Sequence, residues 1–157
     1  MEDYRKHFDY TILRPSAVYG PRDVEDRVVS KFVLNALRGH TIEVRGASEI
    51  LDFTYSMDAA QGIALASTKT CRHDIYNITR CQDDPVTLEL AAEQVVELVG
   101  QGRIEVVDRD MDFPKRGRLS IERARTDLGY DPDFNFSEGL PMYVDWVRSN
   151  YDKLFRY

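Results

Sequence analysis

The sequence has few of the residues that bind metal ions or form disulfide bonds. Its 157 residues include only two cysteines, Cys71 and Cys81, and three histidines. The cysteines do not form a C-x-x-C pair and the histidines are scattered, so the sequence predicts no metal site. The cysteines are most simply interpreted as reduced thiols, which favours a cytoplasmic location; a disulfide between them has little support.

Long hydrophobic runs and an excess of basic residues are also missing. No stretch of roughly 18 or more apolar residues occurs, and residues 1–7 lack the apolar core of a signal peptide. The formal net charge is −6, which argues against a broad nucleic-acid-binding face. A local arginine cluster for a phosphate is still compatible with this charge. We therefore expect neither a membrane nor a nucleic acid as a partner.

The residues that are present indicate a folded α/β domain. Hydrophobic residues make up 43% of the chain and charged residues 31%, as is typical of a globular protein with one core. Alternating and apolar runs predict strands at 10–13, 41–45, 51–57, 74–79 and 104–107. Apolar stripes at helical spacing predict helices at 28–37, 58–66, 88–99 and 120–128, and a last helix from residue 137. Strands and helices thus alternate, which favours a mixed α/β fold.

Several residues predict where these elements begin and end. Pro15 should end the first strand, because proline lacks the N–H that a central strand needs. Asp58, Thr87 and Ser137 are expected at helix N-termini, where a side-chain oxygen can accept a backbone N–H. Gly100 should follow the end of the helix at 88–99.

The first indication of a function comes from residues 11–22, which have the sequence TILRPSAVYGPR. This run resembles the LRP-x-x-VYGPR segment of the extended short-chain dehydrogenase/reductases that act on nucleotide sugars. Further segments are similar to those of the same family and follow in the same order. They are residues 27–32, 52–60, 76–78, 114–132 and 137–140. Each segment is a weak signal, but together they are distributed in the family's order across nearly the whole chain.

The resemblance implies the C-terminal portion of an extended Rossmann-type dehydrogenase. On this view residues 1–157 form one substrate-binding region, with the last parallel strands of the Rossmann sheet and a small mixed α/β domain. Members of the family bind NAD or NADP and a nucleoside-diphosphate sugar, and they oxidise and then reduce the sugar. The sequence does not distinguish between epimerase, dehydratase and reductase.

Two family motifs that carry the chemistry do not occur in the chain. The nine glycines never fall at the G-x-x-G-x-x-G spacing, and no tyrosine is followed by lysine four residues later. Residues 1–8 resemble the end of the helix that carries Tyr-x-x-x-Lys. We therefore expect a fragment without the NAD-binding half, with no catalytic residue, no activity by itself and no stable binding of NAD. Such a fragment should form a homo-oligomer or need the other half.

The resemblance also assigns site residues. Pro15, Ser16 and Val18 match cofactor-binding positions, although Pro15 also ends a strand. The positions that match substrate contacts are Ala17, Arg27, Lys31, Phe32, Val44, Arg45 and Arg116. Arginine suits a phosphate because its planar fork donates two hydrogen bonds to it, but Arg27 and Arg116 are equally compatible with solvated side chains.

Two positions depart from the family pattern and leave an alternative open. Ala17 stands where many relatives have an asparagine that binds the diphosphate, and alanine has no group for that bond. Leu51 stands where the family has arginine, so one expected phosphate contact is missing. The alternative function is a non-enzymatic nucleotide-binding or oligomerising domain derived from the same family.

Overall fold

The protein is described by a computed structural model that covers residues 7, 9–23, 25–112 and 114–154. Apart from His7, the segment 1–8 that resembles the end of a catalytic helix lies outside these residues. The elements in chain order are β1 (Ile12–Pro15), β2 (Val18–Tyr19), α1 (Val28–Leu37), β3 (Thr41–Arg45), β4 (Thr54–Tyr55), α2 (Ser56–Thr68), β5 (Ile75–Ile78), α3 (Leu88–Val99), β6 (Arg103–Val107), the short π-helix η2 (Ala124–Leu128) and α4 (Phe136–Leu154). The predicted α/β class is confirmed.

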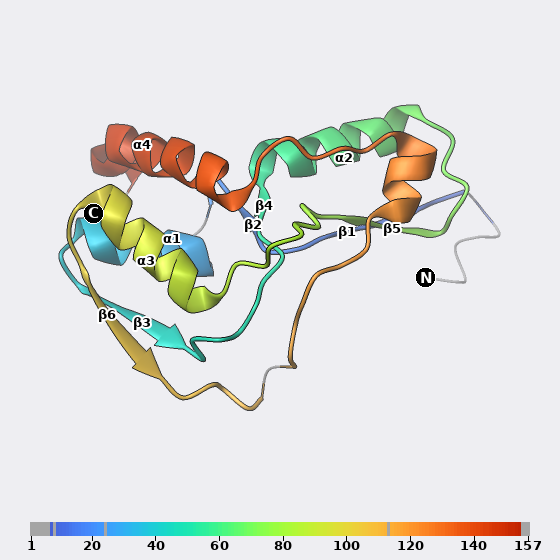
Figure 1. The fold of residues 1–157 in the computed structure, drawn as a ribbon. Helices are drawn as coiled ribbons and strands as arrows, with labels where there is room; N and C mark the ends of the chain where they lie inside the picture. The colour runs from blue at the N-terminus through green and yellow to red at the C-terminus, as the bar shows by residue number, and fades with distance from the viewer. Residues whose placement is uncertain (1–6, 8, 24, 113, 155–157) are drawn as a thin grey trace.

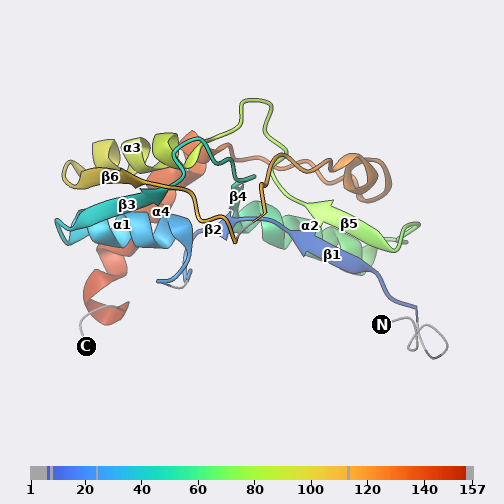
Figure 2. The same cartoon turned by 90° about the horizontal axis from the view of Figure 1, so that it is seen from below.

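The elements divide into two lobes that lie side by side. One lobe holds β3 and β6 with helices α1, α3 and α4, and the other holds β1 and β5 with α2 and η2 (Figures 1 and 2). The short pair β2–β4 lies between them. Each of the three strand pairs, β1–β5, β2–β4 and β3–β6, is parallel. Parallel strands bring their carboxyl ends to one edge, where ligands bind in α/β proteins.

Each lobe has its own hydrophobic core. The larger core is built from α1, α3, α4 and the inward residues of β3, and it includes the aromatic cluster of Tyr19, Phe53 and Phe136. The smaller core packs Tyr76 and Ile78 of β5 against Leu128 and Tyr130. The period-two pattern of β3 is confirmed, because Ile42 and Val44 are buried while their neighbours are exposed.

Strand β1 ends at Pro15, as predicted, but it spans residues 12–15 and not 10–13. The Ile12 N–H donates to the Asp74 carbonyl at 2.7 Å, so alternate N–H groups along β1 face β5. The nitrogen of Pro15 therefore faces the other side, which has no partner strand among the described residues. A proline is tolerated there because it interrupts no ladder bond.

The strand predicted at 51–57 is shorter, and Asp58 is not the N-cap of the following helix. Only Thr54–Tyr55 form β4, and α2 already begins at Ser56. Asp58 is buried and its carboxylate accepts the N–H groups of Asp133 and Phe134, at 2.8 and 3.1 Å. Burial raises the pKa of Asp58, and the two N–H donors oppose that change. The residue thus caps a remote segment instead of its own helix.

The last helix also begins earlier than predicted. Its first residue is Phe136, and Asn135 occupies the capping position in place of Ser137. The Asn135 side chain accepts the Glu138 N–H, and the Glu138 carboxylate accepts the Asn135 N–H, both at 2.9 Å. This reciprocal pair is a capping box. By contrast, Thr87 caps α3 as predicted, since its hydroxyl accepts the Leu90 N–H at 3.1 Å.

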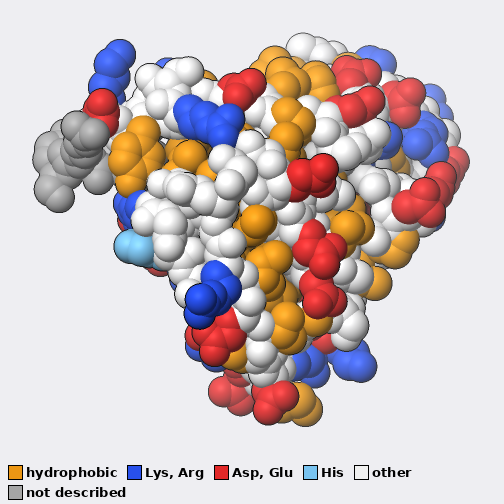
Figure 3. Space-filling view, turned by 60° about the vertical axis from the view of Figure 1, so that its left-hand side comes forward, with side chains coloured by type: hydrophobic (Ala, Val, Ile, Leu, Met, Phe, Trp, Pro, Cys, Tyr) orange, Lys and Arg blue, Asp and Glu red, His pale blue; other side chains and the backbone are white. Residues whose placement is uncertain are grey.

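Hydrophobic side chains reach the surface at several points on the face shown in Figure 3. Among all the described residues, and not only on this face, the most exposed large hydrophobic side chains are those of Met57 and Ile63 on α2, Val106 on β6 and Met111. No helix within the described ranges combines the length and apolarity needed to cross a membrane.

Candidate functional site

Two adjoining pockets form a cleft in which arginine side chains gather. The first, of about 190 Å³, opens at the N-terminus of α1. The second, of about 210 Å³, lies at the carboxyl ends of β3 and β6. Val28, Leu51 and Arg116 line both pockets, so the two adjoin. We call them together the arginine cleft, which is lined by Ala17, Val18, Asp23, Asp26, Arg27, Val28, Val29, Arg45, Glu49, Leu51, Phe53, Leu88, Arg109, Asp110, Pro114 and Arg116.

The first pocket combines a helix N-terminus with two arginines. Arg27 is extended and precedes α1, and its own side chain does not cap the helix. The first N–H groups of a helix have no partner within it and carry a partial positive charge. Arg27 and Arg116 line the same pocket, together with the acidic Asp23 and Asp26. This set of donors suits an anion such as a phosphate group.

The second pocket has apolar walls and charged side chains at its edge. The apolar walls are Val28, Leu51, Leu88 and Pro114. The Arg109 Nε donates to Glu49 at 2.9 Å, and both side chains are about four-fifths buried, at 21% and 20% exposure. Arg45 is more exposed and pairs with Glu43 at 2.7 Å. Apolar walls with a few fixed polar groups are typical of a site for a flat organic ring.

The segment that carries Arg116 is attached to the strand ends by a buried aspartate. Asp52, 6% exposed, accepts the Thr79 hydroxyl at 2.8 Å, the Cys81 N–H at 2.9 Å and the Leu119 N–H at 3.1 Å. Three donors satisfy a buried carboxylate that would otherwise be costly to bury. Asp52 therefore fixes the chain three residues after Arg116.

Ala17 lies in the first pocket with an unusual backbone. Its φ is 40°, in the left-handed region that side chains other than glycine and asparagine rarely adopt. The Ala17 carbonyl accepts the Thr54 N–H at 3.3 Å, which joins the β1–β2 turn to β4. The turn therefore holds this residue in a strained conformation at the edge of the cleft.

The structure brings together some of the residues that the sequence predicts and separates others. Ala17, Val18, Arg27, Arg45 and Arg116 all line the arginine cleft. The remaining five do not line it.

The five predicted residues outside the cleft lie in three different places. Pro15 and Ser16 lie at the end of β1, beside the cleft. Lys31 points outward and pairs with Asp26 at 3.8 Å. Phe32 and Val44 are buried in the larger core, at 5% and 0% exposure. Their binding roles stay predictions.

Sequence reasoning missed Glu49 and Arg109. Glu49 belongs to the loop after β3, and Arg109 follows β6. Because β3 and β6 are parallel and Arg45 pairs with Val107, these two loops must meet at one edge. Knowledge that β3 pairs with β6 would have predicted that Glu49 and Arg109 lie together, but the sequence does not show which strands pair.

The fold agrees with comparisons to known proteins. The sequence model of the NAD dependent epimerase/dehydratase family matches residues 1–79. UDP-glucuronic acid decarboxylase 3 of Arabidopsis thaliana is 32% identical over 154 residues, which cover 94% of this chain and 44% of the relative. The chain thus spans about half the length of the curated relatives it matches.

Solved structures match the fold over the same part of longer chains. dTDP-glucose 4,6-dehydratase of Bacillus anthracis, solved with NAD, has a TM-score of 0.84 at 23% identity. The match covers 98% of this chain and 49% of the dehydratase chain. UDP-glucose 4-epimerase of Thermotoga maritima, solved with UDP-glucose, has a TM-score of 0.84 at 24% identity, with 96% and 50% covered. The resemblance inferred from the motifs is confirmed, and the chain belongs to the NAD dependent epimerase/dehydratase family.

Proposed function

We propose that this chain forms the nucleotide-sugar side of the active site of an NAD-dependent nucleotide-sugar epimerase or dehydratase. The observation that carries the proposal is the first pocket, which Arg27 and Arg116 line at the N-terminus of α1. A diphosphate is the anion for which this set of donors is suited. The second pocket, which has apolar walls, adjoins the first pocket and would hold the base of the nucleotide.

The cofactor would meet this chain at the carboxyl end of β1. Pro15, Ser16 and Val18 are at this edge, and dinucleotides bind at the carboxyl ends of parallel strands. The sequence contains neither the glycine-rich turn nor the Tyr-x-x-x-Lys pair, so these residues would form only one wall of a cofactor site. NAD, when bound in the whole enzyme, would accept and return a hydride; here the chain's residues would orient the sugar nucleotide. A cytoplasmic location stays a prediction.

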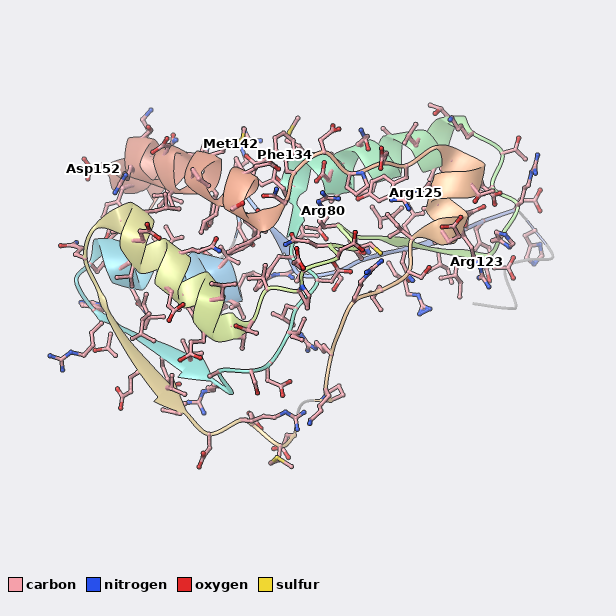
Figure 4. The ribbon with its side chains drawn as sticks, viewed as in Figure 1. Arg80, Arg123, Arg125, Phe134, Met142 and Asp152 are labelled. Atoms are coloured by element: carbon pink, nitrogen blue, oxygen red, sulfur yellow. The ribbon has the colours of Figure 1, made fainter. Side chains whose placement is uncertain are left out.

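Calorimetric titration of the purified chain with UDP, GDP and dTDP tests this proposal. We expect at least one of them to bind with a micromolar Kd, and Arg116→Ala to weaken that binding about tenfold or more, because a charge-assisted contact is lost. Arg123→Ala is the matched control, since Arg123 is exposed on the opposite lobe (Figure 4). Failure to bind any of the three would contradict the proposal and favour a structural or oligomerising domain that does not bind nucleotides.

An activity assay separates binding from turnover. We expect the chain alone to form no NADH and to convert no nucleotide sugar, because no residue in its sequence fulfils the role of the Tyr-x-x-x-Lys pair. Turnover of any nucleotide sugar by the purified chain would contradict this expectation.

A further inference from the structure

We infer that the second pocket of the arginine cleft selects a guanine base, and that the Glu49 carboxylate is the group that recognises it. This inference rests on the proposed function and adds the class of nucleotide to it. The relatives described above act on uridine or thymidine nucleotides by name, so the base is a point on which this chain would differ from them.

The Glu49 carboxylate is fixed at the edge of the pocket. The Glu49 N–H donates to the Gly46 carbonyl at 2.9 Å, and the Glu49 carbonyl accepts the Leu88 N–H at 2.9 Å, which ties the loop to the start of α3. Arg109 Nε then engages one carboxylate oxygen at 2.9 Å. The backbone and one side-chain oxygen are thus both held, while the side chain still lines the cavity.

A fixed carboxylate discriminates between bases through their hydrogen-bonding edges. An ionised carboxylate only accepts hydrogen bonds, and its two oxygens offer about four lone-pair sites. Guanine presents two adjacent N–H donors, at N1 and N2, which match it. Uracil and thymine present one N–H between two carbonyl oxygens, so at least one of these oxygens would face the carboxylate in place of the second donor of guanine. A poorly hydrated acceptor left unpaired disfavours such a ligand.

Arg109 and the apolar walls complement the same ring. The Arg109 guanidinium lies beside Glu49 and only donates hydrogen bonds, so it suits the O6 acceptor of guanine next to N1–H. Leu51, Leu88 and Pro114 provide the apolar faces that a flat ring needs. Along this edge of guanine the O6 acceptor is followed by the N1–H and N2–H donors. The Arg109 guanidinium, a donor, next to the Glu49 carboxylate, an acceptor, is the matching order of groups in the protein.

Calorimetry of the full chain with GDP, IDP, UDP and dTDP tests the inference. IDP differs from GDP only by the missing 2-amino group, so it removes one of the two donors. We expect GDP to bind about 10- to 100-fold more tightly than UDP and dTDP, and IDP about tenfold more weakly than GDP, as expected for a bidentate contact. UDP or dTDP binding as tightly as GDP would overturn the inference while leaving the proposed function intact.

The variant Glu49→Gln assigns the preference to the carboxylate. Its amide has one acceptor and one donor, so we expect GDP to bind about tenfold more weakly and the difference between GDP and IDP to disappear. The control Glu97→Gln changes an exposed carboxylate on α3 and should leave the preference for GDP unchanged. A GDP preference that persists in folded Glu49→Gln would overturn the role of Glu49, and absence of binding by all four nucleotides would overturn both proposals.

Discussion

At the scale of single residues, Ala17 shows how the sequence and the backbone can disagree. The sequence identifies it as an alanine at a position where relatives have asparagine. The structure adds that its φ is 40°, and asparagine tolerates this left-handed region better than alanine does. We therefore expect the departure from the family pattern to lower stability, in addition to its predicted effect on binding.

We expect Ala17→Asn to raise the free energy of unfolding by about 0.5–1 kcal/mol, because it relieves part of this strain. Ala17→Val should lower it by about 1–2 kcal/mol, since a β-branched side chain suits positive φ least. Urea denaturation followed by circular dichroism measures both. The same sign for the two variants would contradict this account.

At the scale of elements, the loop between β3 and β4 depends on Gly46. Its φ is 77°, and an added Cβ would lie 2.9 Å from the Glu49 Cγ and 3.1 Å from the Arg109 Cβ. The glycine therefore permits both the turn and the approach of the Glu49–Arg109 pair. The sequence placed a glycine in a loop, but the side chains that surround it come from two distant segments.

Gly46→Ala should lower the free energy of unfolding by about 2–3 kcal/mol, from backbone strain and crowding together. Gly100→Ala is a matched control, because its φ is 82° but nothing lies within 4 Å of an added Cβ. We expect it to cost only about 1 kcal/mol. Equal losses in thermal or urea denaturation would show that crowding at Gly46 contributes nothing.

At the scale of the whole molecule, strand β1 and helix α2 leave surface without a partner. β1 pairs only with β5 among the described residues, and Met57 and Ile63 on α2 are 61% and 51% exposed. Free strand edges and exposed apolar side chains favour association. These features support the prediction of a self-associated chain or one that binds a complementary half.

We expect light scattering to give a mass above that of the monomer at about 20–50 µM, a range in which exposed edges lead to association. Ile63→Glu is an informative variant, because it removes one exposed apolar side chain from α2 and leaves the β1 edge intact. Association through the strand edge should persist in this variant. A monomer at every concentration would contradict the prediction.

The sequence by itself determined the fold class, most of the elements and the family. Periodicity predicted α1, β3 and α3 because their apolar residues face one side, and this pattern is local. Local signals were less reliable at the starts of α2 and α4. There Asp58 caps the distant Asp133–Phe134 segment and Asn135 takes the place predicted for Ser137.

Only the tertiary structure decided which side chains share the cleft. Val44 and Arg45 are adjacent in the sequence, yet one is in the core and the other lines the second pocket. Glu49 and Arg109 are sixty residues apart, and they meet because β3 and β6 are parallel and end at the same edge. Motifs record residues that are neighbours along the chain, whereas a binding pocket is made by residues that become neighbours only when the strands pair.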